Sequence, residues 1–175
     1  MSESTIRSAL GVLQDEPDNE QAWSDLRTAL GCSEPSAEGG RLTVDPGSMD
    51  RSELASLLEA ARRAHEARRE YDAVSELLEL ESALATGDRA VELTLELARV
   101  RDEILIEDAA AVAAYRRVLV LRPDHEDAKE GIERSEVKRG KWKDLAQKYF
   151  AEAKAANDGA FKSSLLVSAA EIAYR

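Results

Sequence analysis

Apolar residues recur every three to four positions along most of the chain, which is the spacing that gathers them on one face of an α-helix. The clearest case is the range 109–121, where Ala111, Tyr115 and Val118 form one apolar face. Pro123 ends this helix because proline cannot continue it. The same periodicity predicts further helices over 5–14, 20–30, 51–69, 71–85, 89–105, 125–138 and 161–174.

The apolar frame around Tyr115 reappears at fixed offsets on both sides. One copy lies 37 residues earlier and another 34 residues later. Because several positions share one offset on each side, they indicate a repeat array. The matched positions are Val74 and Leu78 before, Ala111 and Tyr115 in the centre, and Leu145 and Tyr149 after.

Several short patterns resemble the tetratricopeptide repeat (TPR) family. Trp23 and Leu26 have the spacing of that family's first helix, and Leu97-Ala98 occupies its Leu-small pair. Gly140 and Trp142 resemble its Gly-x-aromatic turn, so the resemblance implies a turn at 139–142 and a second helix after it. The implied fold is all-α, a right-handed solenoid of antiparallel helical hairpins.

The chain divides into three parts by composition. Residues 31–50 contain four glycines and two prolines, too many for a helix. We therefore expect an N-terminal helical segment (1–30), a flexible insertion (31–50) and a TPR-like array (51–175), whose first helix is capped by Asp50. The 161–174 helix is apolar over most of its circumference, so we expect the array to continue past Arg175 or this helix to self-associate.

Charge and composition limit the classes of partner that the chain can bind. The net charge is −11, from 35 acidic and 24 basic residues, which disfavours non-specific binding to nucleic acid or anionic membranes. No apolar run approaches the roughly 20 residues that cross a bilayer. Cys32 is the single cysteine, so an internal disulfide is excluded. These features predict a cytoplasmic protein.

No reactive constellation stands out. His65 and His125 are the two histidines, and neither lies in a Cys/His cluster, so we expect no metal, no cofactor and no enzymatic activity. The basic stretch 138–143 surrounds Trp142, a combination that could stack on a nucleic-acid strand. The favoured interpretation is that Trp142 packs in a hairpin core and the lysines solvate a turn.

The TPR resemblance implies a groove lined by the first helices of successive hairpins, which receives a peptide. We therefore expect a non-catalytic scaffold for protein–protein interaction; the alternative is an N-terminal regulatory or targeting domain of a larger enzyme. Carried onto this chain, the groove residues are Arg99, Asp102, Asp127, Glu130, Arg134 and Lys138.

Overall fold

The computed structural model of the chain describes residues 3–33, 42–45, 47 and 49–174, and this part is all-α, as the periodicity predicted. It contains no strand in these ranges, apart from an isolated bridge between Ser33 and Thr43. The helices are α1 (Glu3–Asp15), α2 (Glu20–Ala29), α3 (Arg51–Arg68), α4 (Tyr71–Leu84), α5 (Gly87–Arg99), the π-helical turn η1 (Val100–Ile104), α6 (Asp108–Leu121), α7 (Glu126–Ala155) and α8 (Gly159–Tyr174).

Side-chain caps fix the starts of α2 and α3. The Asn19 side chain accepts a hydrogen bond from the backbone N–H of Ala22, which satisfies one free donor of α2. Asp50 accepts from the N–H groups of Ser52 and Glu53 at the start of α3, confirming the predicted cap. A hydrogen bond from the Ser52 hydroxyl, together with these two backbone hydrogen bonds, holds the pKa of Asp50 below its ordinary value.

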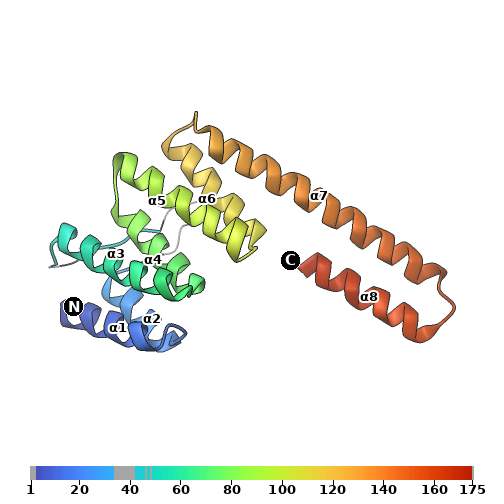
Figure 1. The fold of residues 1–175 in the computed structure, drawn as a ribbon, viewed down its shortest axis with the longest axis horizontal. Helices are drawn as coiled ribbons and strands as arrows, with labels where there is room; N and C mark the ends of the chain where they lie inside the picture. Colours follow the sequence, from blue (N-terminus) through green and yellow to red (C-terminus); the bar gives the residue numbers. More distant parts are fainter. Residues whose placement is uncertain (1–2, 34–41, 46, 48, 175) are drawn as a thin grey trace. The chain divides into compact units, whose positions relative to one another are not determined.

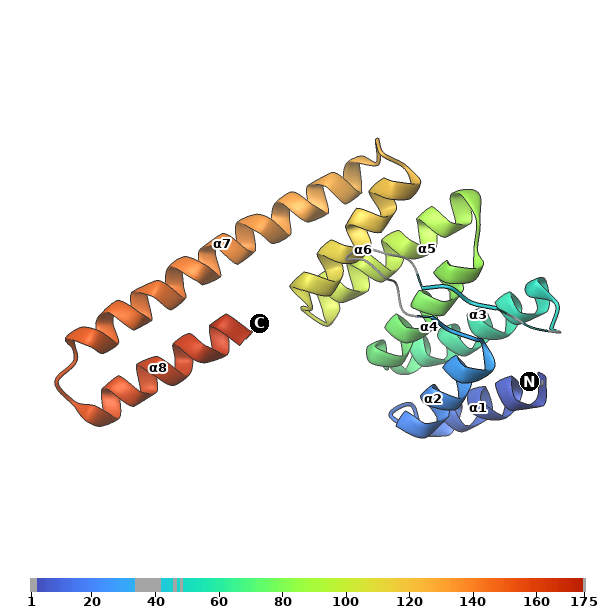
Figure 2. The same cartoon turned by 180° about the vertical axis from the view of Figure 1, so that it is seen from behind.

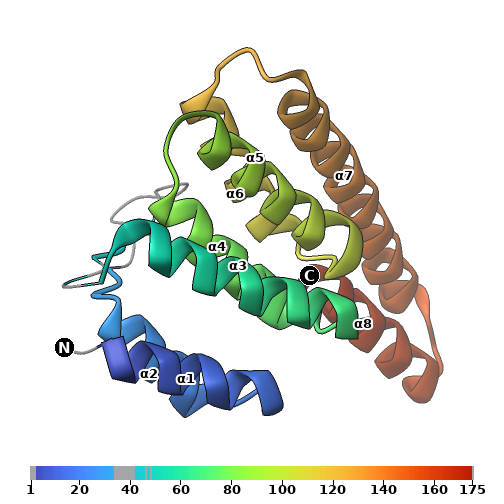
Figure 3. The same ribbon diagram turned by 60° about the vertical axis from the view of Figure 1, so that its left-hand side comes forward.

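Residues 1–128 form one compact unit of three helical pairs (Figure 1). Within it α1 packs on α2, α3 on α4, α4 on α5 and α5 on α6. In Figure 3, α1, α3 and α5 lie on the near side of this unit, with α2, α4 and α6 behind them. The first helices of the three pairs therefore share one side of the unit.

The first pair shares its core with the second. Leu13 of α1 and Leu26 of α2 belong to the same apolar cluster as Leu58 of α3. Val44 and Met49 are also buried in this cluster, although they lie in the predicted insertion. The rest of that insertion falls largely on residues 34–41, outside the described part of the chain. Contacts divide the chain after Ala128, rather than at the composition change near residues 31–50.

The predicted turn at 139–142 is wrong, because α7 runs without interruption from Glu126 to Ala155. Gly140 costs an α-helix only about 1 kcal/mol relative to alanine, and the flanking Lys, Arg, Glu and Ala residues are good helix formers. The predicted copy of the apolar pattern in α7, at Leu145 and Tyr149, also differs from the pattern around Tyr115. Tyr115 is buried, whereas Tyr149 is partly exposed and Trp142 is 38% exposed.

Residues 129–175 form the second unit, in which α7 and α8 run antiparallel as a hairpin (Figure 2). Ala146 and Ala153 of α7 and Leu165 and Ala169 of α8 are buried. The predicted apolar helix at 161–174 is thus confirmed as part of α8. Among the helices of the described residues, none combines the length and apolarity needed to cross a bilayer.

Candidate interaction surface

The structure brings two of the predicted groove residues together. Arg99, at the end of α5, forms an exposed ion pair with Asp127 at the start of α7. Asp102 is instead buried in η1, where the Tyr115 hydroxyl lies 3.4 Å from its carboxylate. A ligand would not reach Asp102 without a rearrangement.

The other three predicted groove residues lie on α7 in the second unit. Glu130, Arg134 and Lys138 are four residues apart, so they follow one side of that helix. Glu130 and Arg134 are exposed and Lys138 is partly buried. They remain candidate contact residues.

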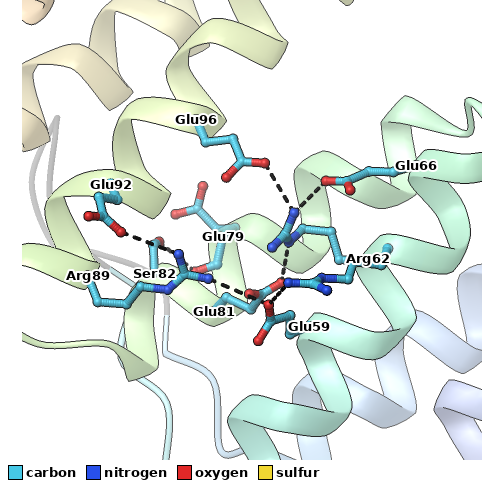
Figure 4. Close-up of polar contacts among 10 residues, drawn as sticks. Glu59, Arg62, Glu66, Glu79, Glu81, Ser82, Arg89, Glu92 and Glu96 are labelled. Carbon is cyan, nitrogen blue, oxygen red and sulfur yellow. Dashed lines mark hydrogen bonds and ion pairs between the residues drawn. The ribbon is translucent and has the colours of Figure 1, made fainter.

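A cluster of ion pairs joins α3, α4 and α5, and Arg62 is at its centre (Figure 4). Arg62 of α3 is 5% exposed, and its Nε donates to Glu81 of α4 at 2.7 Å. Its Nη1 donates to Glu96 of α5 at 3.1 Å and to Glu66 on its own helix. One guanidinium therefore holds carboxylates from three helices.

A second set of ion pairs extends the cluster along α3 and α5. Arg63 donates to Glu59 at 2.6 Å, and Arg89 of α5 lies 4.0 Å from that carboxylate. Arg89 also pairs with Glu92 at 3.4 Å. We call this set of residues, which links α3, α4 and α5, the Arg62 cluster: Glu59, Arg62, Arg63, Glu66, Glu81, Arg89, Glu92 and Glu96.

Carboxylates outnumber guanidiniums in the Arg62 cluster. Burial raises the pKa of Glu81, and the hydrogen bond and charge of Arg62 offset this only in part. Burial also raises the pKa of Glu96; the nearby Glu66 adds to that rise and Arg62 opposes it. For Arg62, burial lowers the pKa, but the surrounding carboxylates outweigh it and the net shift is upward.

The sequence pattern did not predict the Arg62 cluster, although it contains one indication of a buried arginine. Arg62 continues the i, i+4 row of Leu54 and Leu58, which form the apolar face of α3. An arginine on an apolar face needs a buried counter-charge. The identity of that counter-charge depends on α4 and α5, which the local pattern does not contain.

A groove of about 320 Å³ lies between α1 and α3. Its walls are mainly small or aliphatic, and its polar residues are Arg7, Gln14 and His65. Among the described residues its lining includes no carboxylate, although Arg7 is paired with Glu3 and Glu53. The residues that line it are Arg7, Leu10, Gly11, Gln14, Leu57, Ala60, Ala61, Ala64 and His65. A larger and more polar groove lies between α1 and α2.

His65 is 1% exposed and its Nδ1 lies 2.7 Å from the Glu70 carboxylate. Arg68 contacts both residues, and its Nη2 also donates to the backbone oxygen of Gln14 at 2.9 Å. The hydrogen bond from His65 holds the pKa of Glu70 below its ordinary value, and Arg68 adds to this. Within the described residues, no group of His, Cys, Asp and Glu has the arrangement of a metal site.

The basic stretch 138–143 lies in the middle of α7. Trp142 is 38% exposed, so the interpretation that it packs in a hairpin core is wrong. At 100° per residue, Lys138 and Lys141 lie on one side of the helix, and Arg139 and Lys143 lie on another. The stretch therefore does not form one basic face.

No protein-family model, curated protein or solved structure matches the chain.

Proposed function

We propose that this chain is a non-catalytic scaffold of TPR-like helical hairpins that binds a protein partner through the side on which α1, α3 and α5 lie. The observation that supports this proposal is the Arg62 cluster. Its buried guanidinium fixes charged side chains from α3 and α5, while the side chains of Glu66 and Glu96 remain 34% and 43% exposed. Side chains already held in place lose less conformational entropy when they bind.

The excess of carboxylates favours a partner surface that carries basic residues. Such a surface would meet Glu66, Glu92 and Glu96 at the exposed edge of the cluster. Complementary charge accelerates association and suppresses wrong partners more than it raises affinity. We therefore expect the interaction to weaken as ionic strength rises.

Affinity capture with paired variants tests the proposal. Glu66→Lys/Glu96→Lys reverses two charges of the cluster, and Glu20→Lys/Asp25→Lys makes the same change in net charge on the exposed surface of α2. With nuclease-treated lysate of the native host, we expect the cluster variant to lose specific partners and the α2 variant to keep them. Retention of every partner by a folded cluster variant would contradict the proposal.

Self-association through α8 is a separate proposal. Phe161, Leu166 and Val167 of that helix are 56%, 40% and 57% exposed. Apolar side chains exposed on neighbouring turns favour contact with another apolar surface. We expect Leu166→Glu/Val167→Glu to lower the molar mass measured by light scattering at high protein concentration. An unchanged monomer mass in the unmodified chain would reject self-association.

A further inference from the structure

Charge is divided unevenly between the two units. Residues 1–128 contain 28 acidic and 14 basic residues, whereas residues 129–175 contain 7 acidic and 10 basic residues. The net charge is therefore −14 in the first unit and +3 in the second. All seven lysines of the chain belong to the second unit. One molecule thus carries two units of opposite charge.

One side of α7 carries three cations and an aromatic ring. These four side chains lie within about 60° of one another around the helix, over about 22 Å of its length. We call them the basic stripe: Arg139, Lys143, Phe150 and Lys154. The two acidic residues between positions 139 and 154 lie about 100° or more from the middle of the stripe.

The charges of the basic stripe are not compensated within the described part of the chain. Its side chains are exposed, and Phe150 is 44% exposed. Arg139, Lys143 and Lys154 form no ion pair with another described residue, unlike the arginines of the Arg62 cluster. Aromatic residues and arginine are enriched where proteins contact one another. The basic stripe therefore has the composition of a contact surface for an acidic protein.

The Arg62 cluster offers a matching acidic pattern. Its five carboxylates face three guanidiniums, so it has two negative charges in excess. Glu92 and Glu96 are four residues apart on α5, and their side chains are 66% and 43% exposed. Arg139 and Lys143 have the same separation on α7, and side chains four residues apart lie about 6 Å from each other. The two pairs thus match in sign and in spacing.

We infer that the basic stripe of one copy binds the exposed carboxylates of the Arg62 cluster in a second copy of this chain. Arg139 and Lys143 pair with the two carboxylates of α5, and Phe150 is removed from water at the contact. The inference rests on the proposed function and supplies its basic partner surface. Because the two surfaces differ, each copy offers both, and the contact repeats in a ring or an open chain of copies.

The net charge of −11 opposes this association mainly over long distances. At about 0.1 M salt the Debye length is about 10 Å, so charges in direct contact outweigh the repulsion between whole molecules. At about 1 M salt the Debye length is only about 3 Å. We therefore expect association at the lower salt concentration and its loss at the higher one.

Light scattering of the purified, nuclease-treated full chain tests the inference. At about 0.1 M salt, we expect the average molar mass to rise with protein concentration. Arg139→Glu/Lys143→Glu should remain monomeric. Lys141→Glu/Lys148→Glu makes the same change in charge on the opposite side of α7 and should associate like the unmodified chain. A monomer mass in the unmodified chain, or equal association of the two variants, would overturn the inference.

Mixing two variants identifies the acidic surface. Glu92→Lys/Glu96→Lys reverses the acidic side of the contact, so this variant should also be monomeric by itself. In an equimolar mixture with Arg139→Glu/Lys143→Glu, the reversed charges match again and association should return. Monomers in that mixture would overturn the inference. If the α5 variant does not fold, the two α7 variants still decide, because their substitutions are at exposed positions.

Three other outcomes reject the inference and show what replaces it. If Leu166→Glu/Val167→Glu lowers the mass and Arg139→Glu/Lys143→Glu does not, the copies associate through α8. If the unmodified chain is a monomer that binds labelled single-stranded DNA through the stripe, the stripe recognises nucleic acid. If the chain is a monomer and Glu66→Lys/Glu96→Lys loses its partners from lysate, the scaffold function stands without self-association.

Discussion

The first unit contains two partly buried ion-pair clusters of opposite composition. In the Arg62 cluster, one buried guanidinium holds three carboxylates. In the second, which we call the Glu79 cluster, one carboxylate is held by Arg117 and by Arg101 at 3.0 Å; Arg101 also donates to Ser75. The central charge of each cluster is thus surrounded by an excess of the opposite sign.

Because of this difference, the two clusters respond to pH in opposite ways in their contributions to the stability of the fold. Burial raises the pKa of Glu79, but the two arginines outweigh it and the net shift is downward. The pKa values of Glu81 and Glu96 are shifted upward. The Glu79 cluster therefore stabilises the fold above the ordinary pKa of a glutamate and loses this contribution as the pH falls. The contribution of Glu81 and Glu96 decreases as the pH rises through their raised pKa values.

The largest expected effect comes from removing the centre of the Arg62 cluster. Arg62→Met leaves Glu81, which is 4% exposed, without its counter-charge, and should lower the free energy of unfolding by about 3–5 kcal/mol at neutral pH. Urea denaturation measures this change. The loss should diminish on acidification, because Glu81 can then take up a proton.

Two controls accompany that variant. Arg63→Met, at an exposed neighbouring arginine, should change stability by less than about 1 kcal/mol. The double variant Arg62→Met/Glu81→Met should recover most of the lost stability, since an apolar pair can replace a buried ion pair. If the double variant is no more stable than Arg62→Met, the buried charge of Glu81 is not the cause.

A smaller effect is expected from Glu79→Gln, which leaves the buried Arg117 without a carboxylate. We expect a loss of about 2 kcal/mol at neutral pH, the size of a hydrogen bond to a charged group. The variant should also lose less stability than the unmodified chain as the pH falls below the ordinary pKa of a glutamate, because the lowered pKa of Glu79 no longer contributes. Denaturation at a series of pH values measures both. A parallel pH dependence in the two proteins would contradict this account.

The smallest effect concerns the backbone next to the Glu79 cluster. Arg62 comes from a regular helix, whereas Arg101 comes from the π-helical turn η1. After the end of that turn, Ile106 has a φ of 58°. A β-branched residue in the left-handed region is strained, and Ile106 is 57% exposed, so its side chain buries little. Ile106→Asn should therefore stabilise the fold by about 1 kcal/mol. A decrease in thermal stability would show that the Ile106 side chain matters more than the strain.

Helix periodicity predicted most of the fold because it is a local property. The ranges of α3, α4 and α6 agree with the prediction to within about two residues, since their ends are marked by Asp50, by the turn at Arg69-Glu70 and by Pro123. The prediction failed at Gly140, where a single glycine does not end a helix of otherwise favourable residues.

The sequence by itself therefore determined the helical class, most of the helix boundaries and the apolar faces, because each depends on residues within a few positions. Only the tertiary structure decided that Arg62 meets Glu81 and Glu96, which are 19 and 34 residues away. It also decided that His65 lines a groove with α1 and that Asp102 is buried. The physical reason is that side-chain partners are set by how the helices pack, and that information is spread over several helices.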